Sequence, residues 1–250
     1  MSGMFESTLP AGVPDLLSVS AFRRYLDEIS RGPDVDAGAS RLSGLNPSLL
    51  QDLLRFDGRS AEGEGLEVLE VLAACVRHGR ALLVHLQDGQ RVVPLTVFPA
   101  QRLVHTPVPP AELLAGDPTV LRVLHVEPAL LRPPGHPDRT LVGERECHAP
   151  LGPLLWELAL RGAREDLLPE IAGPAAYRLA PGVDLSALKM AGTQAAAVHR
   201  LRRTTSSLRE IAEWPGFDRG RAMRLLNGLY LQAGLIVSRS HPAAGSDGWF

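Results

Sequence analysis

The sequence predicts an α+β protein in which helices surround a small antiparallel sheet and a second helical region follows. Three observations lead to this class: helical apolar spacing in the segments before residue 79, short β-rich runs between residues 81 and 126, and helical spacing again after Pro150. We therefore expect an α+β body over residues 1–149 and a helical region over residues 150–250.

The first helix is predicted over residues 14–30, where Pro14-Asp15 opens it. One face of this segment carries an apolar stripe that consists of Leu16, Val19, Phe22, Leu26 and Ile29. This spacing is typical of a helix that packs one side against a core.

Two further helices are predicted before the sheet. An asparagine cap followed by Pro47 starts one that runs to residue 56. A polar, glycine-rich loop is expected over residues 57–65. The next helix is expected over residues 66–78, with Gly79 placed as its stop.

A β-hairpin is the strongest prediction within the body. Residues 81–86 and 91–98 are β-rich runs, and Asp88-Gly89 between them is a hairpin-turn signal. Pro94 lies inside the second run, which indicates an edge strand or a bulge.

The remaining elements are predicted from shorter patterns. Strands are expected over residues 102–105, 120–126 and 140–148, and helices over residues 110–115, 151–160, 164–171 and 186–203, with a proline-rich connection over residues 128–137.

Composition excludes several classes of protein. No apolar run approaches the roughly 18 residues of a membrane helix, and the first 15 residues lack the features of a secretion signal, so we expect a cytoplasmic protein without a membrane partner. Cys75 and Cys147 have no metal-binding spacing and are expected to be reduced. Lys189 is the only lysine, and its surroundings match no phosphate-loop or Schiff-base motif.

Charge is distributed unevenly along the chain. Residues 195–241 carry eight arginines and three acidic residues, a net charge of +5, which leaves −7 on the rest of the chain. A basic module beside an acidic body is typical of a nucleic-acid binder, but it equally suits a protein partner or an internal contact.

One segment of the C-terminal region has a motif with a clear structural meaning. Ser207 and Glu210 form a capping box that starts a short helix, and Pro215-Gly216 makes a tight turn. Asp218 can then cap a longer helix, which is followed by a strand over residues 235–240.

This order resembles the winged helix-turn-helix superfamily. The resemblance rests on Ser-Leu-Arg-Glu-Ile-Ala at residues 207–212, Arg-Leu-Leu at residues 224–226 and Ala-Gly-Leu-Ile at residues 233–236. It covers about a fifth of the chain, with a module core at about residues 188–241, and it implies binding to DNA or to protein. A plain helical hairpin is the alternative.

The helix over residues 218–233 is expected to bury one apolar stripe and to expose the opposite side. That exposed side would present Arg224, Asn227, Gly228 and Leu231, with Met223 on its flank. Arginine and asparagine side chains can read guanine and adenine edges, whereas leucine, methionine and glycine suit a protein contact. The candidate residues for binding a partner or DNA are Arg202, Arg203, Arg219, Arg221, Arg224, Asn227 and Arg239.

No catalytic, metal or cofactor site is predicted. His85, His105 and His125 stand near strand ends and could converge on a metal, but no carboxylate stands at a matching spacing. Cys147-His148 would point to opposite faces of a strand. Glu67 and Glu70 are expected on the solvent-exposed face of their helix.

The sequence therefore favours a non-enzymatic cytoplasmic regulatory or adaptor protein. The expected partner is another protein, a second copy of the chain or the chain's own acidic body. The alternative is a DNA-binding transcription regulator with an N-terminal sensing or dimerisation body. Exposure of Arg224 and Asn227 in the structure distinguishes the two.

Overall fold

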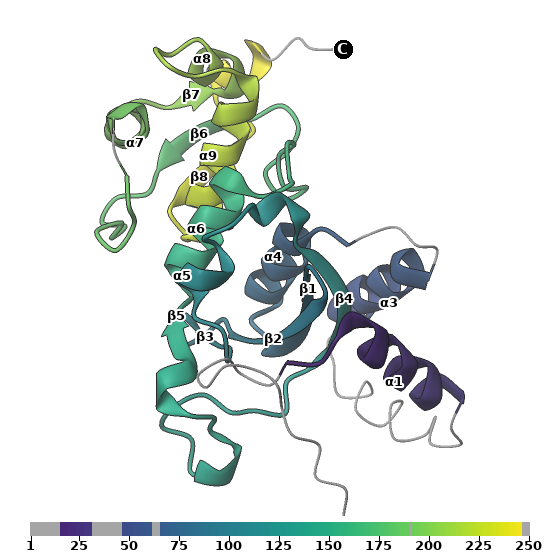
Figure 1. Cartoon of the computed structure of the whole chain (residues 1–250). Helices are drawn as coiled ribbons and strands as arrows, with labels where there is room; N and C mark the ends of the chain where they lie inside the picture. Colours follow the sequence, from purple (N-terminus) through teal and green to yellow (C-terminus); the bar gives the residue numbers. More distant parts are fainter. Residues whose placement is uncertain (1–15, 32–46, 62–65, 191, 247–250) are drawn as a thin grey trace, which may run out of the picture.

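A five-stranded antiparallel sheet forms the centre of the N-terminal body (Figure 1). The computed structural model describes residues 16–31, 47–61, 66–190 and 192–246. The strand order is β4-β1-β2-β3-β5. The strands are β1 (Leu82–Asp88), β2 (Arg91–Phe98), β3 (Leu103–His105), β4 (Arg122–Pro128) and β5 (His148–Pro150).

Helices cover the two faces of this sheet unequally (Figure 1). The main core lies on the face that carries Val84 and Leu95, where the strands meet α3 (Pro47–Ala61), α4 (Val68–His78) and α6 (Leu151–Arg161). On the other face, α1 (Val19–Arg31) packs Val19 and Phe22 against Val92 in a smaller cluster. The short helix α5 (Pro110–Leu113) lies between β3 and β4 in the chain.

The predicted hairpin is confirmed, with a small change at its turn. Asp88 pairs with Arg91, so the two turn residues are Gly89 and Gln90, and Gly89 has a left-handed φ of 60°. The edge-strand prediction for Pro94 holds only locally, because β2 as a whole lies between β1 and β3. Since β3 pairs only with residues 96–98, no strand of the described residues pairs with β2 on that side at Pro94.

The predicted helices before the sheet are present with altered limits. The predicted opening of α1 at Pro14-Asp15 lies outside the described residues, and the helix itself begins at Val19. Helix α3 continues to Ala61, so residues 57–61 are helical and not a loop. Helix α4 begins at Val68 after Glu67, whose side chain accepts a hydrogen bond from the Leu69 N–H, and Gly79 is its left-handed C-cap.

Three predictions in the second half of the chain are wrong. Short 3-10 turns lie at Arg139–Leu141 and Arg145–Cys147, and the strand begins only at His148. Residues 164–171 form no helix, although Leu168 and Ile171 are buried. The helix expected from residue 186 begins at Gly192, and the strand β6 (Ala176–Leu179) was not predicted.

The C-terminal module has the predicted order of helices and a second, three-stranded sheet. The elements are α7 (Gly192–Arg203), β7 (Ser206–Ser207), α8 (Leu208–Ala212), α9 (Arg219–Leu231) and β8 (Leu235–Ser238). Both parts of the capping box at Ser207 and Glu210 are formed, and Asp218 caps α9. The sheet order is β7-β6-β8, so the partner of β8 comes from upstream of α7 and not from a following wing strand.

The hydrophobic core is continuous from the body into the module. One cluster of buried residues runs from Leu49 to Leu231. Helix α6 contributes residues to this cluster between the body and the module. Helix α6, predicted within the helical region after residue 149, packs against α4 and is therefore counted with the body from here on. Its most extensive helix contact is with α9 of the module. Within the described ranges, no helix has both the length and the apolar character needed to cross a membrane.

The module core predicts the cost of losing a central leucine. Leu226 is 0% exposed, and Leu226→Ala should lower the free energy of unfolding by about 2–5 kcal/mol because it leaves a cavity. Ile236→Ala on β8, where the side chain is 44% exposed, should cost less than about 1 kcal/mol. Urea denaturation of both variants measures the difference, and similar costs would contradict the burial of Leu226.

Candidate functional site

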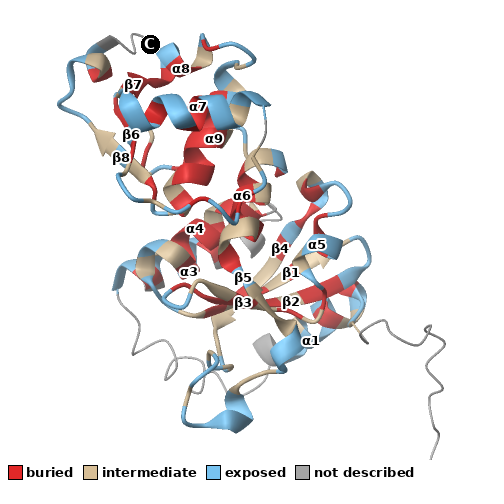
Figure 2. Cartoon of the chain, turned by 90° about the vertical axis from the view of Figure 1, so that its left-hand side faces the viewer, coloured by how far each residue is buried: buried red, intermediate tan, exposed pale blue. Residues whose placement is uncertain are grey.

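The side of α9 that was expected to face solvent is packed against α6. Met223 is 8% exposed, and Asn227 and Leu231 are 0% exposed. Figure 2 shows α9 buried along most of its length, whereas α7 displays exposed residues. The expectation of an open outer face is therefore wrong, because a helix of the body covers it.

A glycine makes this close helix contact possible. A Cβ atom at Gly228 would lie 2.9 Å from Cε3 and 3.0 Å from Cζ3 of Trp156 on α6. Trp156 is itself 1% exposed and has little room to move. The absence of a side chain at residue 228 thus sets how closely the two helices approach.

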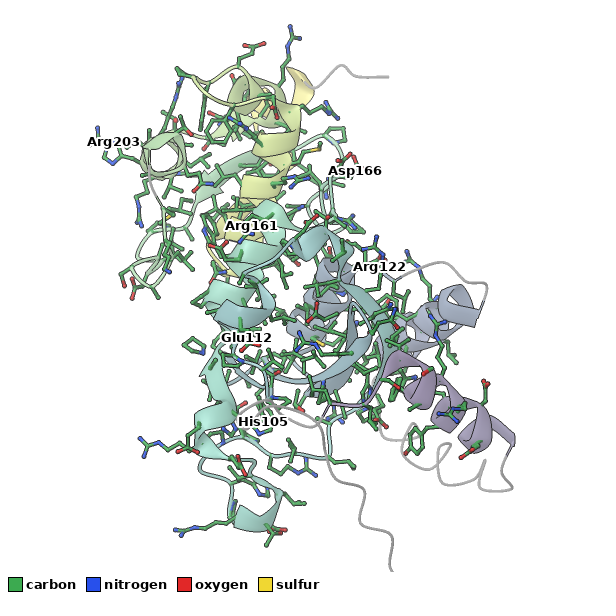
Figure 3. All side chains as sticks on the ribbon, viewed as in Figure 1. His105, Glu112, Arg122, Arg161, Asp166 and Arg203 are labelled. Carbon is green, nitrogen blue, oxygen red and sulfur yellow. The ribbon has the colours of Figure 1, made fainter. Side chains whose placement is uncertain are left out.

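Asn227 binds the loop that follows α6. Its Oδ1 accepts a hydrogen bond from the Leu168 N–H at 2.9 Å, and its Nδ2 donates to the Asp166 carbonyl oxygen at 2.9 Å (Figure 3 labels Asp166). The side chain therefore satisfies two backbone groups in a segment that has no regular structure to pair them. An adenine edge would have to compete with these two bonds.

Arginine side chains connect the two parts of the chain at two points along α9. Near the middle of the helix, Arg224 donates to the Leu160 carbonyl oxygen at 3.1 Å. At its C-terminal end Arg102, in the turn between β2 and β3, donates to the Leu231 carbonyl oxygen and to Gln232 Oε1, both at 2.9 Å. Gln232 in turn donates to the Gly152 carbonyl oxygen at 3.0 Å.

In the polar part of the contact between module and body, most hydrogen bonds are accepted by backbone carbonyl oxygens. The predicted charge difference would favour ion pairs, but the pair between Arg224 and Glu165 spans 3.9 Å, and the Glu165 side chain is 82% exposed. Arg239 also donates to carbonyl oxygens, those of Ala172 and Glu170. An exposed pair of this kind contributes little stability, whereas the directional hydrogen bonds to carbonyl oxygens favour one orientation.

The other candidate residues remain at the surface of the module. Arg202 and Arg203 lie in the last turn of α7, and Arg219 and Arg221 lie in the first turn of α9. All four are exposed, and Figure 3 shows Arg203 pointing away from the body. The structure thus divides the predicted set: Asn227 is buried, Arg224 and Arg239 bind backbone carbonyls across the contact with the body, and the remaining four arginines are exposed on the module.

A hollow between α7 and α9 lies beside these arginines. It has a volume of about 240 Å³, and its lining includes Thr193, Phe217, Arg221 and Arg224. Arg221 donates to the Gly216 carbonyl oxygen at 2.9 Å, so this side chain also stabilises the turn before α9.

The histidines considered as metal ligands lie in two separate pairs. His85 of β1 pairs with His125 of β4, with ring centroids 5.9 Å apart. His105 of β3 pairs instead with His148 of β5, at 4.9 Å, and β2 lies between the two pairs. No group of three or more His, Cys, Asp or Glu side chains in the described part of the chain is arranged to hold a metal ion.

The remaining titratable residues have structural surroundings. The Cys147 Sγ lies 4.0 Å from Glu144 Oε2, and burial together with that carboxylate raises the pKa of the thiol. Glu67 is not on the solvent-exposed face of α4, where it was expected. Its side chain caps α4 and binds Arg164 at 3.0 Å, and burial raises the pKa of its carboxyl group. Glu70 pairs with Arg55 at 3.1 Å.

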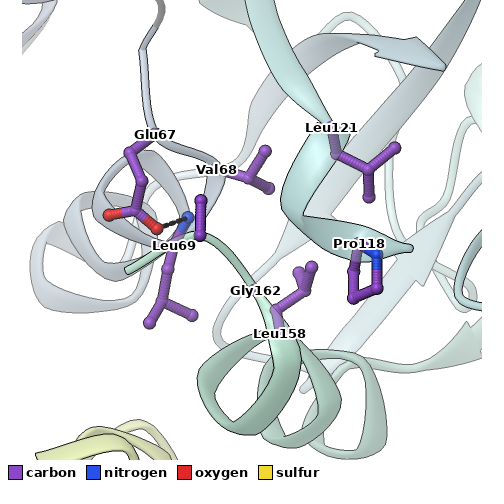
Figure 4. A pocket seen from close by; sticks show the side chains of 8 residues that line it. Glu67, Val68, Leu69, Pro118, Leu121, Leu158 and Gly162 are labelled. Atoms are coloured by element: carbon purple, nitrogen blue, oxygen red, sulfur yellow. Dashed lines mark hydrogen bonds between the residues drawn. The ribbon is translucent and has the colours of Figure 1, made fainter. Parts of the chain in front are cut away.

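Figure 4 shows the small cavity beside Glu67, between α4, α6 and the start of β4. Its volume is about 10 Å³, which is room for about one water molecule. Leu69, Leu121 and Leu158 are among the residues around it. This position is a packed junction and has no space for a substrate.

Comparison with known proteins adds no family or function. No family model, curated protein or solved structure matches the chain.

Sequence reasoning missed residues on both sides of the contact between α9 and the body. Trp156, Arg102 and Gln232 were not among the candidates. The signal that could have indicated Trp156 is the pair of glycines on one side of the module helix, at residues 220 and 228, because a glycine within a helix often marks a close neighbour. Arg102 has no comparable signal in its local sequence.

Two glycines of α9 provide a matched test of the helix contact. Gly228→Ala should lower the free energy of unfolding by about 1–3 kcal/mol, because the new methyl group would overlap the Trp156 ring. Gly220→Ala places its Cβ 3.4 Å from Asp218 Oδ1, an ordinary contact, and should stabilise by up to about 1 kcal/mol through helix propensity. Thermal or urea unfolding checks both, and a neutral or stabilising Gly228→Ala would contradict the close approach.

The first histidine pair predicts a loss of stability in acid. Burial, with a smaller effect of His125, lowers the pKa of His85 from 6.5 to about 4. As pH falls below 6.5, His85 binds a proton in the unfolded chain but stays neutral in the folded chain. The free energy of unfolding therefore decreases until about pH 4, where His85 of the folded chain is protonated as well.

The size of this effect is limited because the His85 ring is only partly buried. We expect His85 to contribute about 1–2 kcal/mol to the loss of stability in acid. His85→Gln should flatten the curve of unfolding free energy against pH in this range. Urea unfolding at several pH values measures it, and an unchanged curve would show that His85 already titrates normally.

Proposed function

We propose that this chain is a non-enzymatic regulatory or adaptor protein that acts by binding another protein. In this proposal the C-terminal module is of winged-helix type, and α9, the helix that would read DNA in such a module, holds the module on its own body. The observation that carries the proposal is the burial of Asn227 and its hydrogen bonds to residues 166 and 168.

The arrangement of elements supports a winged-helix type with one change. The order α7, β7, α8, α9 and β8 is the order of helices and strands in the predicted motif. The strand next to β8 is β6, which precedes α7 in the chain. Because β6 already pairs with β8, the sheet does not need a wing strand after β8. The module therefore has one element fewer that could enter a DNA groove.

The surface left open suits an acidic protein partner. Arg202, Arg203, Arg219 and Arg221 are exposed at the ends of α7 and α9 that remain outside the contact with the body. Arginine binds carboxylates in a planar, two-point geometry and is enriched in protein interfaces. Charged surfaces of opposite sign also increase the rate of association.

DNA reading by α9 would require the module to leave the body. Arg224 and Asn227 are the side chains of α9 that suit base edges, and both bind the chain's own backbone. Separation would also expose Met223, Leu231 and the Trp156 ring. These costs favour protein binding over DNA reading by the intact chain.

A duplex titration tests this proposal. We expect a mixed-sequence duplex to bind no more tightly than about 10 μM at physiological salt, the range of non-specific contacts. The triple variant Arg219→Ala, Arg221→Ala, Arg224→Ala should weaken this non-specific binding only in part, because it removes three of the eight arginines of residues 195–241 that can contact phosphates and no base-reading contact.

The titration is done by fluorescence anisotropy at low and moderate salt. Binding at about 1 μM or tighter that weakens steeply with salt and is lost in the triple variant would overturn the proposal in favour of a DNA-binding regulator.

A further inference from the structure

A groove beside α6 adjoins the contact with α9, and the two share Trp156. Its volume is about 580 Å³, which is within the range of small-molecule sites. Its walls come from α5, from β5, from α6 along its length and from the segment before α7 that contains Lys189. The apolar part of the lining includes Ala111, Leu114, Pro150, Pro153 and Leu154.

Two cationic side chains stand in the lining of this groove. Arg161 is held in place by hydrogen bonds to the Leu114 and Gly116 carbonyl oxygens, at 3.1 and 3.0 Å. Lys189, the only lysine of the chain, is exposed and has no ion pair within the described residues. Glu157 is the one acidic residue of the lining, and it lies 3.5 Å from Arg161. The charges of the lining therefore sum to +1.

Trp156 belongs to the apolar lining of the groove. Its side chain is 1% exposed, so it contributes to the base of the groove and not to its polar contacts.

We propose that the groove binds an amphipathic monocarboxylate, with a medium-length alkyl chain or an aromatic ring as its apolar part. The apolar part contacts the alanine, leucine and proline side chains of α5 and α6. The carboxylate is neutralised by Lys189 and Arg161, the two cationic side chains of the lining. This site is separate from the proposed protein-binding function and does not depend on it.

The single lysine allows a direct test with the full-length protein. Reductive ¹³C-methylation labels only Lys189 and the N-terminal amine and keeps both positively charged. Octanoate should shift the Lys189 methyl resonance with saturation at a dissociation constant of about 1 mM or tighter, the affinity reasonable for a ligand of about ten heavy atoms. Octan-1-ol should bind at least about tenfold more weakly, because it lacks the charge.

Matched variants locate the site without disturbing the core. Ala111 on α5 is exposed and lines the groove, so Ala111→Trp should fill it and abolish the octanoate shift. Ala195 on α7 is equally exposed and lies outside the groove, so Ala195→Trp should bind octanoate as the unaltered chain does. Lys189→Gln, measured by calorimetry, should weaken octanoate binding about five- to tenfold and leave octan-1-ol unchanged.

The outcomes separate the proposal from its failures. A Lys189 resonance that does not move up to about 10 mM octanoate, about ten times the expected dissociation constant, would overturn it. Equal binding of octan-1-ol and octanoate would overturn the carboxylate assignment. Undiminished binding by Ala111→Trp would show that octanoate binds elsewhere. A saturable shift that is lost only in the groove variants supports the site.

Discussion

The position of the C-terminal module depends on the close approach of Gly228 to the Trp156 ring. A side chain at residue 228 would overlap this ring, so the distance between α9 and α6 is available only to glycine. Once the helices are this close, Leu231 and Met223 are buried with them. The apolar contact and the hydrogen bonds around it then fix one orientation of the module.

The hydrogen bonds of this contact follow from the irregular chain after α6. Residues 162–175 contain no helix or strand, so their backbone groups need partners from elsewhere. Asn227, Arg224 and Arg239 supply donors to carbonyl oxygens between residues 160 and 172, and Asn227 also accepts from Leu168. The arginine-rich composition of the module thus has a structural use that needs no nucleic acid, because a guanidinium offers five donors.

Local signals predicted several elements well. The turn glycine of the hairpin, the capping box at Ser207 and the Asp218 cap each act within a few residues, and all three are present in the structure. The apolar stripe of α1 is present in part, since Val19 and Phe22 are buried together.

The errors concern features that depend on distant partners. Residues 164–171 have helical apolar spacing, but Leu168 is buried as part of a loop that Asn227 holds. Strand β6 pairs with residues about thirty and sixty positions away, and its own sequence is too short to indicate this. The prediction of a single buried apolar stripe also failed for α9. Such a stripe assumes that one side of the helix is buried, whereas α9 contacts both α8 and α6.

One backbone amide, that of Leu168, reports directly on the contact between module and body. The Leu168 N–H is buried and donates to Asn227 Oδ1 at 2.9 Å, although Leu168 lies in a segment without regular structure. Hydrogen exchange at this amide, followed by NMR on the full-length chain, should be slowed by about a hundredfold or more relative to an unstructured peptide, and Asn227→Ala should remove much of that protection. Exchange at the rate of an open loop in the unaltered protein would contradict the packing of α9 on the body.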